Sequence, residues 1–198
     1  MSHYYINDKN LGNEYRKFSY DFKGKRINFT SDLGVFSKDR LDFGTHVLLQ
    51  SLPDLSNKKS LLDVGCGVGC IGLSLKKAYN KLEVNMIDVN ERCIELSEKN
   101  AKDNNLEVKV MLSNLYENVS GQYDVIISNP PIRAGKQVVL GVVIEGYNHL
   151  NKDGEVYVVI QKKQGAESMK RKLEEVYGNV SIETKEKGYF VFKSIKKI

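Results

Sequence analysis

Apolar and polar positions along the chain follow two different periods, and the changes between them mark successive strands and helices. Short apolar runs typical of buried strands lie around Asp63 and over 83–87, 108–112, 123–127 and 155–160. Apolar residues three or four positions apart, typical of helices, cover 71–79, 91–104, 135–150 and 166–177. Strands that alternate with helices in this way predict a parallel, doubly wound α/β sheet.

The two ends of the pattern differ from its middle. Alternation around a glycine turn predicts a small N-terminal β-hairpin over 18–30, and a similar pattern predicts a closing antiparallel hairpin from 180–184 and 189–194. A short helix over 47–52 ends before Pro53. We expect one domain over 1–198, with an arm (1–17), a hairpin extension (18–30) and a catalytic core (31–198).

The most informative stretch follows the first strand of the core. Gly65, Gly67 and Gly69 alternate with other residues directly after Asp63-Val64, and an apolar helix begins next. Glycines permit positive φ and let a ligand approach the backbone at the start of a helix. A strand, a glycine turn and a helix in this order predict a nucleotide-type site.

Two kinds of cofactor use such a turn. Residues 67–72 read G-x-G-x-x-G, and Asp88 follows at the spacing of a dinucleotide fingerprint, which indicates NAD. Asp63, however, precedes the first glycine by two residues. A carboxylate there would repel a pyrophosphate and would suit the cationic amino-acid head of S-adenosylmethionine (SAM), so the sequence favours SAM and leaves NAD as the alternative.

Polar residues stand at the predicted ends of four strands: Asp63, Asp88, Asn114 and Asn129. In parallel sheets these ends share one edge, where ligands bind. Asp88 is placed to accept hydrogen bonds from both ribose hydroxyls. Asn114 is placed to accept a hydrogen bond from the adenine amine.

Asn129-Pro130-Pro131 follows the fourth strand. Two consecutive prolines make a rigid, extended segment, so the Asn129 side chain and the Pro130 carbonyl are held as two fixed acceptors. The exocyclic amine of a nucleobase is a poor nucleophile because its lone pair is delocalised into the ring. Two acceptors that bind both N–H groups favour a tetrahedral nitrogen and direct its lone pair at a methyl donor.

Composition limits the remaining possibilities. With 41% hydrophobic and 28% charged residues, the 198-residue chain is typical of a globular protein, and its net charge of +5 is compatible with a polyanionic partner. Its three cysteines, Cys66, Cys70 and Cys93, form no disulfide framework or zinc motif, so we expect a reduced, cytoplasmic setting and no metal. No apolar run is long enough to span a membrane.

Several motifs together resemble the RsmC-like methyltransferases, a family of small-subunit ribosomal RNA guanine-N2 methyltransferases and single-domain relatives. These motifs are Gly34-Val35-Phe36-Ser37, Leu41-Asp42-Phe43-Gly44, 63–69, 129–136 and 159–165. The resemblance implies a seven-stranded, mostly parallel, Rossmann-like SAM methyltransferase fold with an antiparallel C-terminal hairpin strand. It also implies SAM as cofactor and RNA as partner, either ribosomal RNA or a ribosomal assembly intermediate, with the enzyme a monomer or a weak homo-oligomer.

These arguments lead to three sets of expected site residues. The catalytic residues are Asn129, Pro130 and Pro131. The resemblance suggests that Phe36, Ser37, Asp42 and Thr45 approach the cofactor. The other expected cofactor-binding residues are Asp63, Gly65, Cys66, Gly67, Gly69, Asp88, Val89, Asn114, Leu115 and Asn129. The substrate-binding residues are Ile132, Arg133, Gly135 and Lys136.

Four alternatives stay open at this point. Adenine N6 in RNA or DNA, or a protein amide, would present the same N–H₂ group to Asn129. Ile132 stands where the wider Asn-Pro-Pro group places an aromatic residue that stacks on the base, which leaves the substrate open. Besides these two alternative methyl acceptors, adenine N6 and a protein amide, the chain could be an NAD-dependent oxidoreductase or a non-catalytic RNA-binding protein.

Overall fold

The computed structural model describes residues 14–32 and 40–198. Its main sheet has seven strands in the order β5-β4-β3-β6-β7-β9-β8. They are β3 (Ser60–Val64), β4 (Glu83–Asp88), β5 (Lys109–Leu112), β6 (Tyr123–Ser128), β7 (Leu150–Gln161), β8 (Ser181–Glu186) and β9 (Tyr189–Ile195). Strands β3 to β7 are parallel, and β9 is antiparallel to both β7 and β8. This confirms the predicted fold class.

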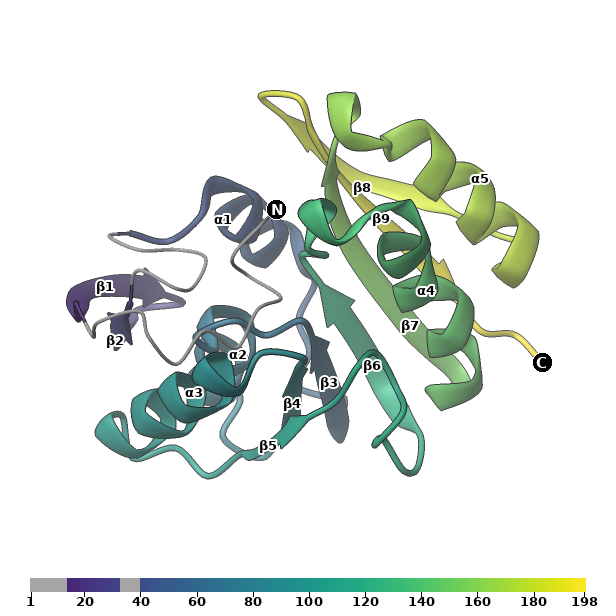
Figure 1. Cartoon of the computed structure of the whole chain (residues 1–198). Helices are drawn as coiled ribbons and strands as arrows, with labels where there is room; N and C mark the ends of the chain where they lie inside the picture. The colour runs from purple at the N-terminus through teal and green to yellow at the C-terminus, as the bar shows by residue number, and fades with distance from the viewer. Residues whose placement is uncertain (1–13, 33–39) are drawn as a thin grey trace.

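Helices cover both faces of the sheet (Figure 1). One face carries α1 (Phe43–Ser51), α2 (Cys70–Ala78) and α3 (Glu91–Asp103), and the other carries α4 (Lys136–Gly146) and α5 (Ala166–Tyr177). Three 3₁₀ turns, η2 (Ile132–Ala134), η3 (Tyr147–His149) and η4 (Lys162–Gln164), flank α4 and β7. Successive strand residues point to opposite faces, so Leu61 packs in one buried cluster and Leu62 in the other.

The N-terminal hairpin consists of β1 (Arg16–Phe22) and β2 (Lys25–Ser31) and packs beside α3 (Figure 1). Two asparagines on α3 act as a partner for the edge of β2. Asn100 accepts from the N–H of Thr30 (2.7 Å) and donates to its carbonyl (3.0 Å), and Asn104 does the same for Asn28. The predicted hairpin is confirmed, but the arm boundary at residue 17 was wrong, because pairing with Ser31 begins at Arg16.

Three element boundaries differ from the prediction for identifiable reasons. Helix α1 begins at Phe43 instead of residue 47, because the Asp42 carboxylate caps it by accepting from the N–H of Thr45 (3.0 Å). Helix α4 ends at Gly146, and the chain passes through η3 into β7. Strand β7 begins at Leu150 rather than 155, because Asp153 and Gly154 continue its pairing with Lys196.

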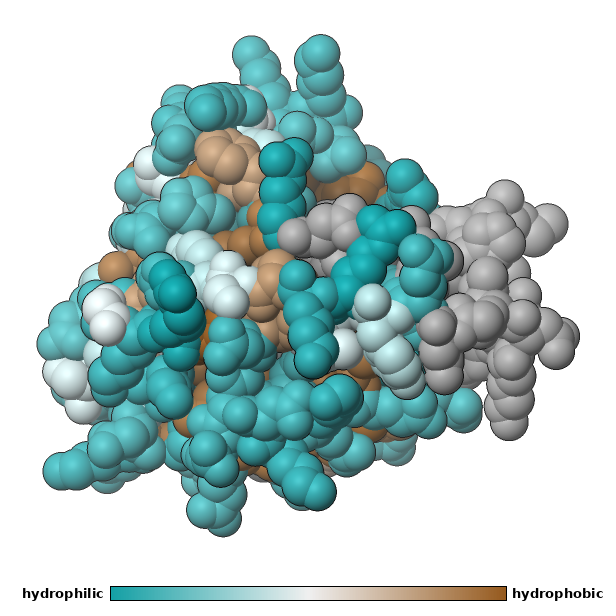
Figure 2. All heavy atoms as spheres, turned by 90° about the vertical axis from the view of Figure 1, so that its left-hand side faces the viewer, coloured by the Kyte–Doolittle hydropathy of each residue, from teal (hydrophilic) through white to brown (hydrophobic). Residues whose placement is uncertain are grey.

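Figure 2 shows the side of the molecule that carries the hairpin and α1 to α3. The described surface there is mainly hydrophilic, with apolar residues visible only in small areas. Within residues 14–32 and 40–198, no helix has the length and apolar character needed to cross a membrane.

Candidate functional site

The chain reverses direction across the sheet between β3 and β6. From β3 it continues outward through β4 and β5, and β6 then begins the opposite half of the sheet. Ser128 at the end of β6 donates to the carbonyl of Val64 at the end of β3 (2.7 Å), which joins the two strand ends. In open α/β sheets such a reversal opens a crevice at the carboxyl ends of the strands, where ligands bind.

The glycine turn after β3 has the backbone shape that the sequence predicts. Gly65, Gly67 and Gly69 have φ of 73°, 57° and 91°. Its N–H groups, however, are used within the protein: those of Gly65 and Cys66 both donate to the carbonyl of Ile87 (2.9 Å), and that of Gly67 donates to Asp88 (2.9 Å). These three N–H groups are therefore not available to a phosphate, which binds groups of this kind.

Asp88 connects the glycine turn to the next helix. One carboxylate oxygen accepts from Gly67, and the other accepts from the N–H of Asn90 (2.9 Å). Each carboxylate oxygen has two acceptor positions. Asp88 also lines the hollow described next, so its carboxylate is placed to accept from a pair of ribose hydroxyls there.

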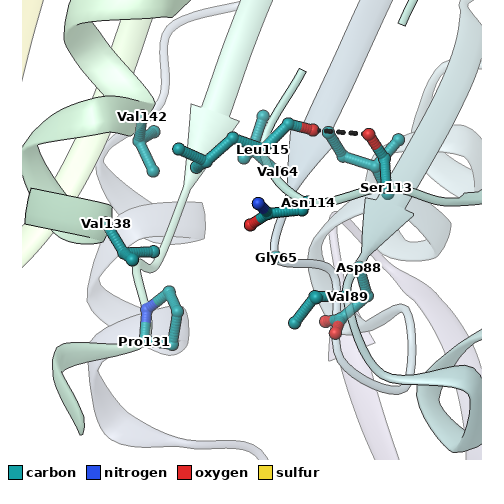
Figure 3. Close-up of a pocket in the computed structure, with 11 residues that line it drawn as sticks. Val64, Gly65, Asp88, Val89, Ser113, Asn114, Leu115, Pro131, Val138 and Val142 are labelled. Carbon is teal, nitrogen blue, oxygen red and sulfur yellow. Dashed lines mark hydrogen bonds between the residues drawn. The ribbon is translucent and has the colours of Figure 1, made fainter. Parts of the chain in front are cut away.

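A hollow lies between the glycine turn and the start of α4. Figure 3 shows Pro131, Val138 and Val142 along one side, Asp88, Val89 and Asn114 along the other, and Gly65 between them. Val64, Ile87, Ser113 and Leu115 complete the lining. Apolar walls with one carboxylate and one amide are what a nucleoside requires: surfaces for the base and acceptors for the ribose and the amine. The residues therefore fit the adenosine part of SAM.

The amide of Asn114 has a defined orientation. Its nitrogen donates to Glu117 Oε1 (2.9 Å), three residues further on, and both side chains are exposed. A carboxylate only accepts hydrogen bonds, so the carbonyl oxygen of Asn114 is the end left for a ligand. That is the acceptor that the sequence-based assignment of Asn114 to the adenine amine requires.

The position of Asp63 differs from the expectation. Its side chain lies under α2 with no exposed surface, where one oxygen accepts from the N–H of Gly72 (2.9 Å) and the other has no partner among the described residues. Burial, with a smaller contribution from the charge of Asp88, raises the pKa of Asp63 to about 7. Asp63 is not among the residues that line the hollow, and its carboxylate holds the first turn of α2.

Two other expected cofactor residues have their side chains or backbone turned to the protein interior. The Cys66 thiol lies 3.7 Å from Ser97 Oγ on α3, and burial raises its pKa. Gly69 caps α2, and a Cβ built there would lie 2.9 Å from Leu73 Cδ1. Cys66 and Gly69 therefore stabilise the conformation of the glycine turn through contacts in the protein interior.

Asn129, at the end of β6, makes its contacts with a distant part of the chain. Its amide nitrogen donates to Asp42 Oδ2 (2.8 Å) and Thr45 Oγ1 (3.1 Å) at the start of α1. Asp42 and Thr45, which the sequence assigned to the cofactor, therefore contact Asn129. Among the described residues nothing donates to the Asn129 carbonyl oxygen or to the Pro130 carbonyl, whereas the Pro131 carbonyl accepts from Ala134 (2.9 Å).

The Asn-Pro-Pro segment adjoins the glycine turn directly. Pro131 lines the hollow, and a Cβ built on Gly65 would lie 3.6 Å from Pro131 Cδ. Gly65 and Asn129 are 64 positions apart in the sequence, but their two motifs form one continuous site in the structure. Asn129 and Pro130 directly precede Pro131 in the chain and so adjoin this site.

The expected substrate residues surround the start of α4. Arg133 and Lys136 are exposed, and Gly135 precedes α4 with φ of 97°. Ile132 is half-buried and packs against the α4 and α5 cluster. Phe36 and Ser37 lie outside the described residues.

Sequence reasoning missed several residues of the site. Ile87, Ser113, Val138 and Val142 line the hollow, and the helical pattern after Asn129-Pro130-Pro131 could have suggested the two valines. Glu117 could have been found from its three-residue spacing to Asn114. No sequence signal links Asp42 to Asn129, because the pair forms only when α1 packs against the sheet.

A comparison with known families finds a model described as the methyltransferase small domain, which matches residues 26–193. The chain is 44% identical over 197 residues to the uncharacterized protein YbxB of Bacillus subtilis (strain 168), covering 98% of each chain. It is 34% identical over 157 residues to the ribosomal RNA small subunit methyltransferase C of Vibrio vulnificus (strain CMCP6). That match covers 76% of this chain but 45% of the Vibrio protein.

Solved structures show the same fold. The T. thermophilus 16S rRNA N2 methyltransferase RsmC, in complex with AdoMet and guanosine, matches 94% of this chain and 52% of its own, with a TM-score of 0.83 and 23% identity. A ribosomal protein L11 methylase from Lactobacillus delbrueckii subsp. bulgaricus matches 70% of each chain, with a TM-score of 0.61 and 22% identity. At these identities the likeness establishes the fold.

Proposed function

The chain belongs to the methyltransferase small domain family, and from that premise we propose that it transfers a methyl group from SAM to an exocyclic amine of a nucleobase in RNA. The proposed target is N2 of a guanine in small-subunit ribosomal RNA. The observation that carries the proposal is that Asn129 and Pro130 directly precede Pro131, which lines the hollow with Gly65, and that no described residue donates to Asn129 Oδ1 or to the Pro130 carbonyl.

In this proposal the hollow holds the cofactor. Asp88 accepts from the ribose hydroxyls, the Asn114 carbonyl accepts from the adenine amine, and the apolar side chains of Val89, Leu115 and Val138 cover the ring. When bound, SAM supplies a methyl group on a positively charged sulfur, which needs no metal or general base to be reactive.

The Asn-Pro-Pro segment binds the acceptor amine. The two N–H groups of the amine donate to Asn129 Oδ1 and to the Pro130 carbonyl. These two hydrogen bonds favour a tetrahedral nitrogen, whose lone pair is less delocalised into the ring. Orientation of this kind contributes up to roughly 7–11 kcal/mol to lowering a barrier in well-ordered systems. After transfer the nitrogen carries an extra proton, which leaves to water.

The choice of RNA rests on the relatives and on charge. The Vibrio vulnificus protein and others like it are named ribosomal RNA small subunit methyltransferases, but this chain spans less than half of their length. Exposed basic side chains stand near the site at Arg133 and Lys136, and at Lys162 and Lys163 directly after β7. Such residues neutralise phosphates.

The test is incubation of the protein and tritiated SAM with separate pools of small-subunit RNA, DNA and protein from cells that lack this protein. We expect label in the RNA pool, and digestion of that RNA to nucleosides should yield N2-methylguanosine. Asn129→Ala should lower kcat about 100-fold. Gln137→Ala is the matched control, since Gln137 is an exposed amide in the first turn of α4 whose side chain hydrogen-bonds to no described residue.

Each alternative result would overturn a specific part of the proposal. N6-methyladenosine would replace the guanine assignment, and label confined to DNA or protein would overturn the RNA assignment. An Asn129→Ala enzyme as active as the Gln137→Ala control would overturn the two-acceptor mechanism. Binding of NADH without binding of SAM in a calorimetric titration would overturn the cofactor.

A further inference from the structure

The two ends of an asparagine amide have nearly the same shape. Only a hydrogen-bonding partner decides whether the nitrogen or the oxygen faces a given direction. For Asn129 this choice is decisive: with the oxygen toward the hollow the side chain binds an amine, and with the nitrogen there it repels one. The residue therefore needs a partner that holds one orientation.

Asp42 is that partner. The Asn129 amide nitrogen lies 2.8 Å from Asp42 Oδ2, and an ionised carboxylate has no hydrogen to donate. The reversed amide would place its carbonyl oxygen against this carboxylate, which exchanges a charge-assisted hydrogen bond for a repulsion. Thr45 Oγ1 accepts from the same nitrogen at 3.1 Å, so both hydrogens of the amide are directed at the start of α1.

We infer that Asp42, assisted by Thr45, is a positioning residue that fixes the Asn129 amide with its carbonyl oxygen toward the acceptor amine. This inference rests on the proposed function. It assigns to Asp42 a role different from contact with the cofactor, since its observed bonds go to Asn129 and to the backbone of its own helix.

The structure holds the Asp42 carboxylate firmly in place. The same oxygen that meets Asn129 accepts from the backbone N–H of Thr45 (3.0 Å) and so caps α1. A Cβ on Gly44 would lie 3.0 Å from that oxygen and 2.8 Å from Tyr189 Cε1, so only glycine leaves room for the carboxylate and the ring together. Helix α1 in turn packs on β7 and β9, and its residues Val47, Leu48 and Leu49 are buried.

The first experiment separates orientation from cofactor binding. Asp42→Ala should lower kcat for RNA at least 30-fold, while the Kd for SAM by calorimetry changes less than threefold. Asp42→Asn should stay within about fivefold of wild type, because its own carbonyl oxygen can still accept from Thr45 and from Asn129. Asp54→Ala is the matched control: Asp54 also accepts from a backbone N–H, that of Ser56, but does not contact Asn129.

Loss of the cap could unfold α1 in Asp42→Ala, so a second pair of variants tests the contact alone. Thr45→Val keeps the backbone N–H that Asp42 accepts and removes only the hydroxyl, and we expect kcat to fall three- to tenfold. Thr45→Ser keeps the hydroxyl and should restore the rate. A Thr45→Val enzyme with normal kcat, together with an Asp42→Ala enzyme that loses only SAM affinity, would overturn the inference.

A third measurement does not depend on catalysis. In protein labelled with ¹⁵N-asparagine, the side-chain NH₂ signals of Asn129, identified by their loss in Asn129→Ala, should exchange slowly with water in wild type and rapidly in Asp42→Ala. Equal exchange in both proteins would overturn the inference even if RNA is methylated. Slow exchange in a wild type that methylates no RNA would instead support the positioning and overturn the proposed function.

Discussion

Two asparagines, one in each half of the sheet, have side-chain amides that are oriented by the same kind of hydrogen bond but by partners in different parts of the chain. Asn114, after β5, and Asn129, after β6, each direct the amide nitrogen at a carboxylate and leave the carbonyl oxygen for a ligand. For Asn114 the carboxylate belongs to Glu117, three residues away and exposed. For Asn129 it belongs to Asp42, 87 residues away and part-buried.

The difference corresponds to what each side of the site has to do. On the cofactor side, an exposed amide makes one of several contacts with a large ligand, so water can replace Glu117 at little cost. On the acceptor side, the orientation of one amide decides whether the amine binds at all. There the partner is held by a helix cap and by a helix packed on the sheet.

The largest effect that sharpens this comparison should come from Asp88→Ala on the cofactor side. The variant loses the ribose acceptors and the partners of the Gly67 and Asn90 N–H groups. Two charge-assisted hydrogen bonds correspond to about 100-fold in affinity, so calorimetry should show the Kd for SAM raised by about that factor. The kcat for RNA at saturating SAM should stay within a few-fold of wild type.

Asp103→Ala, which removes an exposed carboxylate of α3, is the control and should bind SAM normally. If Asp88→Ala lowers kcat as strongly as it weakens SAM binding, the two sides are not separable and the comparison is broken.

The next effect concerns stability and pH. Asp63 has a pKa of about 7 in the folded protein, well above its value of about 3.9 in the unfolded chain. The folded state therefore binds more protons between these values, and stability falls as pH rises from about 4 to about 7. At about 1.4 kcal/mol per pH unit, this group alone lowers the free energy of unfolding by about 2 kcal/mol between pH 5 and pH 7.

Urea denaturation of wild type and Asp63→Asn at the two pH values measures this contribution. The variant should lack that part of the decline. Asp54→Asn is the control, because hydrogen bonds from Ser56 lower the pKa of Asp54, which keeps it ionised over this range. Parallel curves for wild type and Asp63→Asn would show that Asp63 is already ionised at pH 5.

A smaller effect, on RNA binding, tests an exposed basic residue on the side of the site that binds the acceptor amine. Arg133→Ala should weaken RNA binding a few-fold at low salt and reduce the slope of log K against log salt by about one, as expected for one lost phosphate contact. Arg26→Ala is the matched control, since Arg26 lies on the hairpin and pairs with Asp21 (2.8 Å). An equal change of slope for Arg26→Ala would extend the RNA surface to the hairpin.

The smallest effect should come from Glu117→Ala. Because Asn114 and Glu117 are both exposed, water can take the place of the carboxylate, and we expect the Kd for SAM to rise only two- to threefold. Glu107→Ala, an exposed acid ahead of β5, provides the baseline. A rise in the SAM Kd of Glu117→Ala as large as the fall in kcat expected for Asp42→Ala, at least 30-fold, would remove the contrast between a local and a distant partner.

The sequence by itself determined the elements and the motifs. Strand and helix order, the hairpin at each end, the glycine turn and the position of Asp88 follow from patterns within about ten residues, because periodicity and backbone hydrogen bonding are local. The resemblance carried by several such motifs implied the family, which the match over 26–193 confirms.

Only the tertiary structure decided how the polar groups are used. It placed Asp63 beneath α2 instead of in the hollow, and it directed the N–H groups of the glycine turn to Ile87 and Asp88. It also joined Asp42 to Asn129. Each of these contacts links segments that meet only when helices pack on the sheet, so burial and partner choice depend on packing and leave no periodic trace in the chain.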